Sequence, residues 1–426
     1  MEIINVGRVV DLSSLLSLPD RAPALAAPSA LHPDARPLGE RVGSWARAQG
    51  LVLGDPGASP LGRARCDRLA ARVFPTAGLD RVELVSRWLT WAFALDDTLD
   101  ETPLGGSATA VLGLYDDLLS AVRRGRARPG AQPLESTLVE LWRATVPGMS
   151  RDWRRRFLQH MEEHRAGCAE EAVGRRIGDV PTLPGYPAQR RRSAAPFLFD
   201  LIEPVLGVEL PCRLMTAPPW KRLLEGTADL VAWSNDVASH VRESGRGGAH
   251  NHVAVLGAAY GFEPAQAAGW VVDRIAHRAA DVAATARTLE ADLERFRFTA
   301  AEYALTERIV QVLLVVPRAH LDWLAESGRY RTEAGTETEA GAETEAKAET
   351  GVEQPWEAPP PRPRLRKRKP QGKFPQTPEE PPPAPEADPD PEPAPAPAPK
   401  PGAAEERPPQ PDRKPRGLLD VLESLD

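Results

Sequence analysis

The chain has 426 residues, with 53 lysines and arginines against 60 aspartates and glutamates, and a net charge of −7. Its three cysteines are odd in number and widely spaced, which argues against a disulfide framework or a structural zinc site. No segment has the ~20 apolar residues of a membrane span. Residues 1–330 have almost no net charge, so they lack the excess of basic residues expected of a nucleic-acid-binding domain. The first residues lack a secretory pattern, so we expect a cytoplasmic protein.

Residues 1–38 contain five prolines and few charge pairs, and we expect an irregular N-terminal lead-in there. Residues 39–330 show apolar side chains three and four positions apart, interrupted by prolines, which is typical of helices joined by short loops. Strand patterns are nearly absent. We therefore predict one all-α domain, a helical bundle large enough to enclose a central apolar cavity. The predicted helices span 40–49, 62–73, 79–99, 108–123, 135–145, 152–172, 190–206, 219–242, 264–296 and 300–325.

Residues 331–426 have a different composition, since they hold 23 of the 45 prolines and most of the net negative charge. A six-residue repeat begins at Thr332, and a basic run from Arg362 to Lys369 interrupts the proline-rich part. This part of the chain has too little apolar surface to offset the conformational entropy that it would lose on folding. We therefore expect a disordered tail. Residues 417–426 could form a short amphipathic helix, either as a fraying end or as a docking peptide.

Acidic residues cluster at the end of the predicted helix 79–99. Asp96 and Asp100 are four apart and share a helix face, with Asp97 on its flank. Like charges at this spacing repel each other, so the cluster costs stability unless a cation binds there. Carboxylates suit a hard ion such as Mg²⁺. By itself the cluster could also be a solvated acidic helix end.

A second set of candidate oxygen ligands lies on the predicted helix that starts near Pro219. Asn235, Ser239 and Glu243 are spaced four apart and therefore fall close to one face. Amide, hydroxyl and carboxylate oxygens again suit Mg²⁺. Taken alone, this set could be a hydrogen-bonded polar seam between helices.

Together these motifs resemble the bacterial class I terpene synthases (terpene cyclases). Asp96-Asp97-Thr98-Leu99-Asp100 resembles the family's aspartate-rich motif, and Asn235, Ser239 and Glu243 resemble its second metal motif. The segment from Tyr186 to Ser193 is similar to the one that carries a diphosphate-sensing arginine, here Arg190. Arg329-Tyr330 resembles the terminal Arg-Tyr pair. The resemblance covers roughly residues 20–330 and implies the class I terpenoid synthase fold.

The resemblance implies how a prenyl diphosphate would be bound. Three Mg²⁺ ions are expected, with Mn²⁺ as a second candidate. Asp96 would hold two of them, with Asp97 and Asp100 as further candidate ligands, and Asn235, Ser239 and Glu243 would hold the third. The groups expected to donate hydrogen bonds to the diphosphate are Arg190, Arg242, Arg329 and Tyr330.

A carbocation formed from this substrate needs an apolar, inert pocket, and aromatic faces stabilise cations. The candidates to line that pocket are Phe93, Trp88, Phe197, Phe199 and Trp323, each of which could instead be ordinary packing core. Farnesyl diphosphate is the commonest substrate in the family, and geranyl or geranylgeranyl diphosphate are the alternatives.

Two departures from the family pattern stand out. Ala194-Ala195 occupy the place where a glycine usually follows the sensor segment, so the helix break there could be shaped differently. Arg242 precedes Glu243 where lysine is common, which keeps the charge but changes its reach.

Two other functions are open at this stage. A chain-elongating prenyl diphosphate synthase is also all-α, but it would need a second aspartate-rich motif where this chain has Asn235, Ser239 and Glu243. A non-enzymatic helical scaffold would act through the tail, whose partner the sequence does not name. A homodimer is compatible with the sequence.

Overall fold

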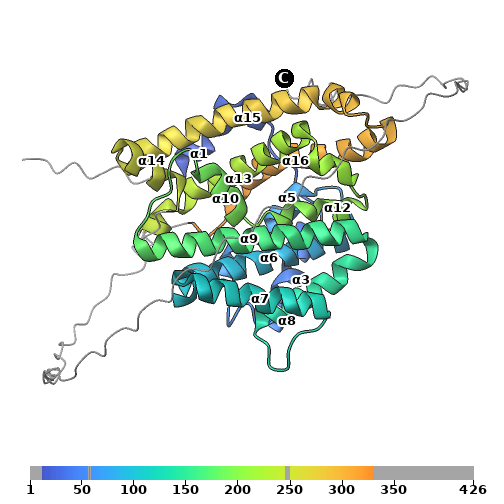
Figure 1. The fold of residues 1–426 in the computed structure, drawn as a ribbon, viewed down its shortest axis with the longest axis vertical. Helices are drawn as coiled ribbons and strands as arrows, with labels where there is room; N and C mark the ends of the chain where they lie inside the picture. Colours follow the sequence, from blue (N-terminus) through green and yellow to red (C-terminus); the bar gives the residue numbers. More distant parts are fainter. Residues whose placement is uncertain (1–11, 56, 58, 245–249, 331–426) are drawn as a thin grey trace, which may run out of the picture. The chain divides into compact units, whose positions relative to one another are not determined.

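The computed structural model describes residues 12–330 except 56, 58 and 245–249 (Figure 1). Every regular element in these residues is helical, which confirms the predicted all-α class. All of them belong to one compact unit. The predicted tail, its terminal helix and the first eleven residues lie outside the described residues. None of the helices in the described ranges combines the length and apolarity required to cross a membrane.

The long helices follow the periodicity of the sequence, and several of them begin at a capping side chain. The Ser107, Ser150 and Thr299 side chains each accept a backbone N–H at a helix start. The longer helices are α3 (Ala35–Ala48), α5 (Cys66–Val73), α6 (Leu79–Glu101), α7 (Ala108–Arg124), α8 (Pro133–Thr145), α9 (Arg151–Ile177), α13 (Pro218–Ser244), α14 (His252–Tyr260), α15 (Pro264–Arg295) and α16 (Ala300–Glu326).

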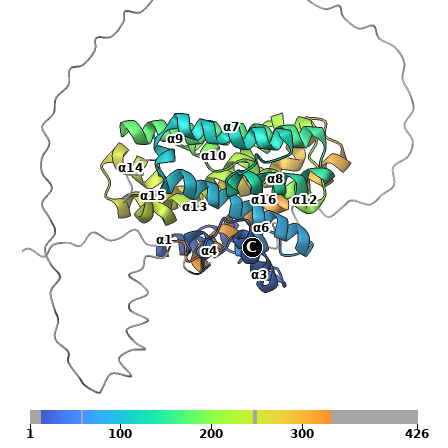
Figure 2. The same ribbon diagram turned by 90° about the horizontal axis from the view of Figure 1, so that it is seen from below.

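The long helices pack in two groups. α6 packs against α5 and α8, and α9 packs against α7, as the two views show (Figures 1 and 2). In the other group, α13 packs against α15 and α16. The short helix α10 (Tyr186–Ser193) contacts both α9 and α13 and so links the groups.

The N-terminal segment is more ordered than the sequence predicts. In place of an irregular lead-in, residues 12–34 contain α1 (Ser13–Leu16), α2 (Leu18–Arg21) and the 3₁₀ helix η1 (Pro23–Leu25), and α3 begins at Ala35. Pro19 and Pro23 occupy first-turn positions, where a missing N–H costs no helical hydrogen bond. Leu15, Leu18 and Leu25 are buried, so this segment adds to the core.

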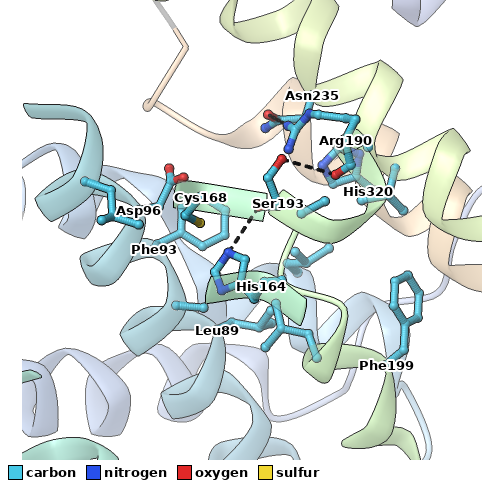
Figure 3. Close-up of a pocket in the computed structure, with 18 of the residues that line it drawn as sticks. Leu89, Phe93, Asp96, His164, Cys168, Arg190, Ser193, Phe199, Asn235 and His320 are labelled. Atoms are coloured by element: carbon cyan, nitrogen blue, oxygen red, sulfur yellow. Dashed lines mark hydrogen bonds between the residues drawn. The ribbon is translucent and has the colours of Figure 1, made fainter. Parts of the chain in front are cut away.

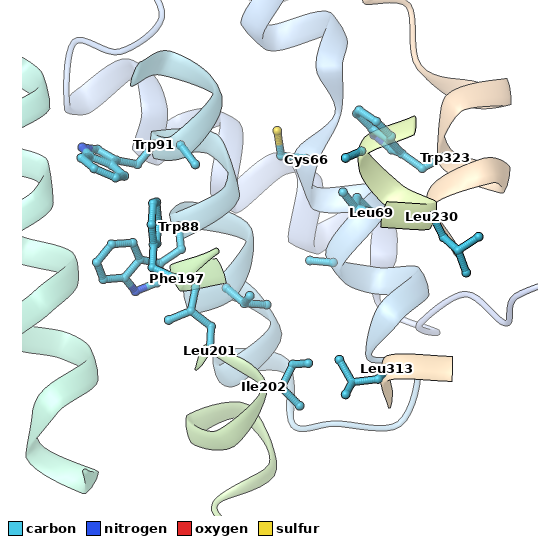
Figure 4. Close-up of a cluster of buried hydrophobic side chains, with 14 of the residues drawn as sticks. Cys66, Leu69, Trp88, Trp91, Phe197, Leu201, Ile202, Leu230, Leu313 and Trp323 are labelled. Carbon is cyan, nitrogen blue, oxygen red and sulfur yellow. The ribbon is translucent and has the colours of Figure 1, made fainter. Parts of the chain in front are cut away.

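An aromatic cluster forms the core between α6, α8 and α9, as Figure 4 shows in part. Trp88 lies 5.8 Å from Trp91, 5.2 Å from Phe157 and 6.5 Å from Phe197, between ring centroids. Trp88 also donates a 2.9 Å hydrogen bond from Nε1 to Thr145 Oγ1 on α8. In the structure Trp88 and Phe197, two of the candidates for the pocket lining, pack within this cluster and are fully buried.

The predicted helix 190–206 is broken into α10, α11 (Phe197–Asp200) and α12 (Ile202–Leu206). Ala195 has φ of 51°, in the left-handed region that favours glycine. Pro196 disfavours right-handed helical backbone in the residue before it, which explains why the chain turns here. The break is thus present although alanine stands at this position.

Replacing Ala195 by glycine should stabilise the protein by about 1 kcal/mol, because glycine adopts positive φ without the steric cost that alanine carries. The control is Ala194→Gly, at φ of −89°, which should be neutral or destabilising. Urea unfolding followed by circular dichroism measures both. A less stable A195G variant would contradict this account of the break.

Candidate active site

A cavity of about 300 Å³ lies among α5, α6, α9, α10, α13 and α16 (Figure 3). Its lining divides by chemistry into charged or hydrogen-bonding groups and a larger apolar wall. The polar side chains include Asp96, Asp100, Glu171, Arg175, Arg190, Asn235, Arg242, Glu243 and Tyr330. The apolar wall includes Leu69, Val73, Phe74, Val85, Leu89, Phe93, Leu198, Phe199, Ile202, Val231 and Val316.

The acidic end of α6 is paired with the terminal arginine. The Arg329 guanidinium donates from Nη1 and Nη2 to the two Asp97 oxygens at 3.1 and 2.6 Å, and from Nη2 to Asp96 Oδ2 at 3.3 Å. Its side chain is only 1% exposed, and its Cζ lies 4.9 Å from the Phe93 ring centroid. Residues more than 230 positions apart therefore meet in one charged cluster.

Asp100 has a partner that the sequence analysis missed. Arg175 on α9 reaches it with Nη1 at 3.2 Å from Asp100 Oδ1, and Glu171 lies one turn earlier on the same helix. Burial and the nearby Asp96 raise the pKa of Asp100 to about 7. Glu171 and Arg175 belong to a highly charged helix, so nothing local in the sequence distinguishes them from its solvated residues.

Of the predicted oxygen set on α13, Asn235 and Glu243 line the same cavity. Asn235 Nδ2 donates to the Tyr330 hydroxyl at 2.8 Å, and Glu243 Oε2 accepts from Asn251 Nδ2 at 3.0 Å. The Ser239 hydroxyl is buried and has no hydrogen-bond partner in the described part of the chain. An unsatisfied buried hydroxyl costs about 1–3 kcal/mol, so its oxygen is suited to a ligand that the protein itself does not provide.

Taken by themselves, no three carboxylate, thiolate or imidazole side chains within the described ranges are arranged to hold a metal ion. The acidic residues of α6 instead pair with Arg175 and Arg329. The set on α13 adds amide and hydroxyl oxygens to the carboxylate of Glu243. Such a mixed oxygen set fits a hard divalent cation.

Asp236 fixes the position of Arg190. Its Oδ1 accepts from Arg190 Nε at 2.9 Å, and its Oδ2 accepts from the Tyr186 hydroxyl at 2.6 Å and the His252 backbone N–H at 3.3 Å. Arg190 Nη2 also donates to Asn235 Oδ1 at 3.2 Å. Sequence reasoning assigned Asp236 no role, although its place beside Asn235 in the motif was the available signal.

The remaining predicted residues separate into those that line the cavity and those behind its wall. Arg242 and Tyr330 line it, and Arg242 Nε is buried without a partner among the described residues. Phe199 also lines it. Trp323 is fully buried behind Phe93, with ring centroids 5.7 Å apart, and supports that ring from outside the cavity.

His164 is a further wall residue that the sequence did not indicate. Its Nδ1 lies 2.8 Å from the Tyr115 hydroxyl and its Nε2 lies 3.1 Å from the Ser193 carbonyl oxygen, as Figure 3 shows for the second bond. Burial lowers the pKa of His164 to about 4, so the ring is neutral at neutral pH. Both nitrogens are engaged, and the ring ties α9 to the end of α10.

The chain is similar to known proteins in sequence and in fold. Residues 87–281 match the family model described as terpene synthase family 2, C-terminal metal binding. The (-)-delta-cadinene synthase of Streptomyces clavuligerus is 30% identical over 298 residues, covering 69% of this chain and 90% of that protein. The (+)-T-muurolol synthase of Roseiflexus castenholzii, whose description adds (2E,6E)-farnesyl diphosphate cyclizing, is 28% identical over 228 residues, covering 53% and 70%. The crystal structure of germacradien-4-ol synthase from Streptomyces citricolor has the same fold, with a TM-score of 0.63, 24% identity, and coverage of 72% and 99%.

Gly105 allows the acidic end of α6 to keep its position. A Cβ on Gly105 would lie 1.6 Å from the Leu99 carbonyl oxygen, within the turn of α6 that carries Asp96 and Asp100. Gly105→Ala should therefore destabilise the protein by about 1–3 kcal/mol, as overpacking does. The neighbouring Gly106→Ala is the control, since a Cβ there has nothing within 4 Å. Equal unfolding midpoints in urea for the two variants would contradict the prediction.

Proposed function

Because this chain belongs to the terpene synthase family, we propose that it ionises an allylic prenyl diphosphate and cyclises the carbocation to a terpene hydrocarbon or alcohol. The observation that carries the proposal is the division of the cavity lining between acidic and arginine side chains and an apolar wall. An amphiphilic substrate with an anionic head and a hydrocarbon chain matches both parts. The catalytic domain in this proposal is residues 39–330, with the N-terminal helices packed on it.

Ionisation requires that negative charge developing on the leaving diphosphate is stabilised. Arg190, Arg242, Arg329 and the Tyr330 hydroxyl are the donors in this proposal. Arg190 is held in place by Asp236, so its remaining guanidinium N–H groups are oriented before substrate binds. Hydrogen bonds that strengthen as charge develops lower the barrier rather than merely tightening binding. The free Arg242 Nε is consistent with an anionic ligand.

The two oxygen sets fit divalent metal ions. Asp96, Asp97 and Asp100 would hold Mg²⁺ from α6, and Asn235, Ser239 and Glu243 would hold it from α13, with three ions in all and Mn²⁺ as a substitute. The unpartnered Ser239 hydroxyl supports this assignment. Bound there, the ions would act as Lewis acids toward the diphosphate.

The apolar wall would fold the hydrocarbon chain and keep water out. The Phe93 ring is fixed between Trp323 and the Arg329 guanidinium, so its face has a defined position for a developing cation. Phe199 contributes a second ring. We propose farnesyl diphosphate as substrate, because the similar muurolol synthase is described as cyclising it.

The direct test is incubation of the full chain with Mg²⁺ and geranyl, farnesyl or geranylgeranyl diphosphate, followed by mass spectrometry of volatile products. We expect a cyclic C15 product from farnesyl diphosphate. A parallel reaction that includes isopentenyl diphosphate tests the alternative of a chain-elongating prenyl diphosphate synthase. Formation of a longer prenyl diphosphate would identify that class of enzyme. Mg²⁺ removal by a chelator should abolish the reaction.

Asp96→Ala and Asn235→Ala should each lower turnover by at least about 100-fold, because each removes a ligand for an ion that balances diphosphate charge. The matched control is Asp80→Ala on the same helix, whose carboxylate is 91% exposed and whose loss should leave turnover unchanged. Helical circular dichroism checks that each variant folds. Full activity in either D96A or N235A would refute the assigned site.

A further inference from the structure

Three histidines line the cavity, and His320 on α16 differs from His164 in having free capacity for hydrogen bonding. It lines the cavity, is 4% exposed, and its Nδ1 has no partner in the described residues. Burial alone lowers its pKa to about 3, and no charged or hydrogen-bonding group contributes to that shift. Figure 3 labels His164 and His320 among the lining side chains, but only His164 has a hydrogen bond drawn.

The part of the cavity wall that α5 and α16 form beside His320 is apolar. α16 packs against α5, whose contributions to the lining are Leu69, Ala70 and Val73. Val316, one turn before His320, also lines the cavity. A buried water needs two to four polar partners, which these side chains do not supply. The unpaired ring therefore costs stability, unlike His164, whose two nitrogens are bonded.

We propose that His320 is the proton acceptor that ends the cyclisation; this inference rests on the proposed function. A C–H bond on a carbon adjacent to the cationic carbon breaks, and its electron pair forms the C=C bond of the product. The proton goes to the ring nitrogen that carries none. After the product leaves, the imidazolium returns this proton to solvent, so the ring is neutral for the next turnover.

The charge balance makes this step favourable in a dry cavity. The carbocation and the imidazolium each carry one positive charge, so proton transfer adds no new buried charge to the cavity. A weakly basic imidazole suffices, because a carbocation is a far stronger acid than a protonated histidine. The Trp323 ring, with its centroid 5.4 Å from that of His320, also stabilises the positive charge.

The experiment uses the full chain with farnesyl diphosphate and Mg²⁺, with two readouts: diphosphate release and the distribution of products. His320→Ala should keep diphosphate release within about threefold, because ionisation depends on other groups. It should lower the share of the wild-type product at least about tenfold in favour of other termination products, as expected on loss of a general base. Val316→Ala, which removes lining volume from the same helix face, is the control for cavity shape.

Chemical rescue separates basicity from shape. Added imidazole should restore the wild-type product in H320A, whereas isoxazole, which has nearly the same size but almost no basicity, should not. Neither azole should change the products of V316A. His320→Gln retains hydrogen bonding but cannot take the proton, so it should also lose the wild-type product.

Three results would overturn the assignment of His320: an unchanged product share in H320A, equal rescue by both azoles, or retention of the wild-type product as the major product of H320Q. If neither azole restores H320A, H320Q decides, since loss of the wild-type product there supports the base. Absence of diphosphate release in the wild-type chain would instead contradict the proposed function itself.

Discussion

The buried ion pair between Arg190 and Asp236 is the contact on which the rest of the site depends. Asp236 is 1% exposed and binds Arg190, the Tyr186 hydroxyl and the His252 N–H, while its backbone carbonyl accepts from Asn251 Nδ2. One carboxylate thus joins α10, α13 and the start of α14. Breaking a buried pair leaves an uncompensated charge and costs about 3–5 kcal/mol, so this geometry is strongly specified.

A second charged contact lies at the acidic end of α6. Arg329 lies beyond the end of α16, yet it meets Asp96 and Asp97 because the chain there is anchored to the segment before α5. Trp323 Nε1 donates to the Ala64 carbonyl at 2.7 Å, and the Gly328 N–H donates to the Arg63 carbonyl at 3.1 Å. These neutral bonds hold the terminal Arg-Tyr pair at the acidic end of α6. The positive charge of Arg329 there lies beside the negative charges of Asp96 and Asp97.

The apolar part is built in two layers with different roles. Trp88, Phe157 and Phe197 pack among themselves and stiffen α6 against α9. Phe93 lies on the cavity face of α6 and is supported by Trp323 from behind. A rigid outer layer fixes the contour of the wall, and a fixed contour is what directs a reactive chain to one folded shape.

The sequence by itself determined most of the longer helices and the candidate ligands that share a helix face, because spacing of three or four residues is a local property of the backbone. It indicated Asp96 and Asp100 on one helix, and Asn235, Ser239 and Glu243 on another. Only the tertiary structure decided which face of α6 meets the cavity, that Asp236 positions Arg190, and that Arg175 reaches Asp100. It also decided that His164 is bonded while His320 is free. These outcomes depend on contacts between residues far apart in the chain, and such contacts follow from how whole helices pack rather than from any local pattern.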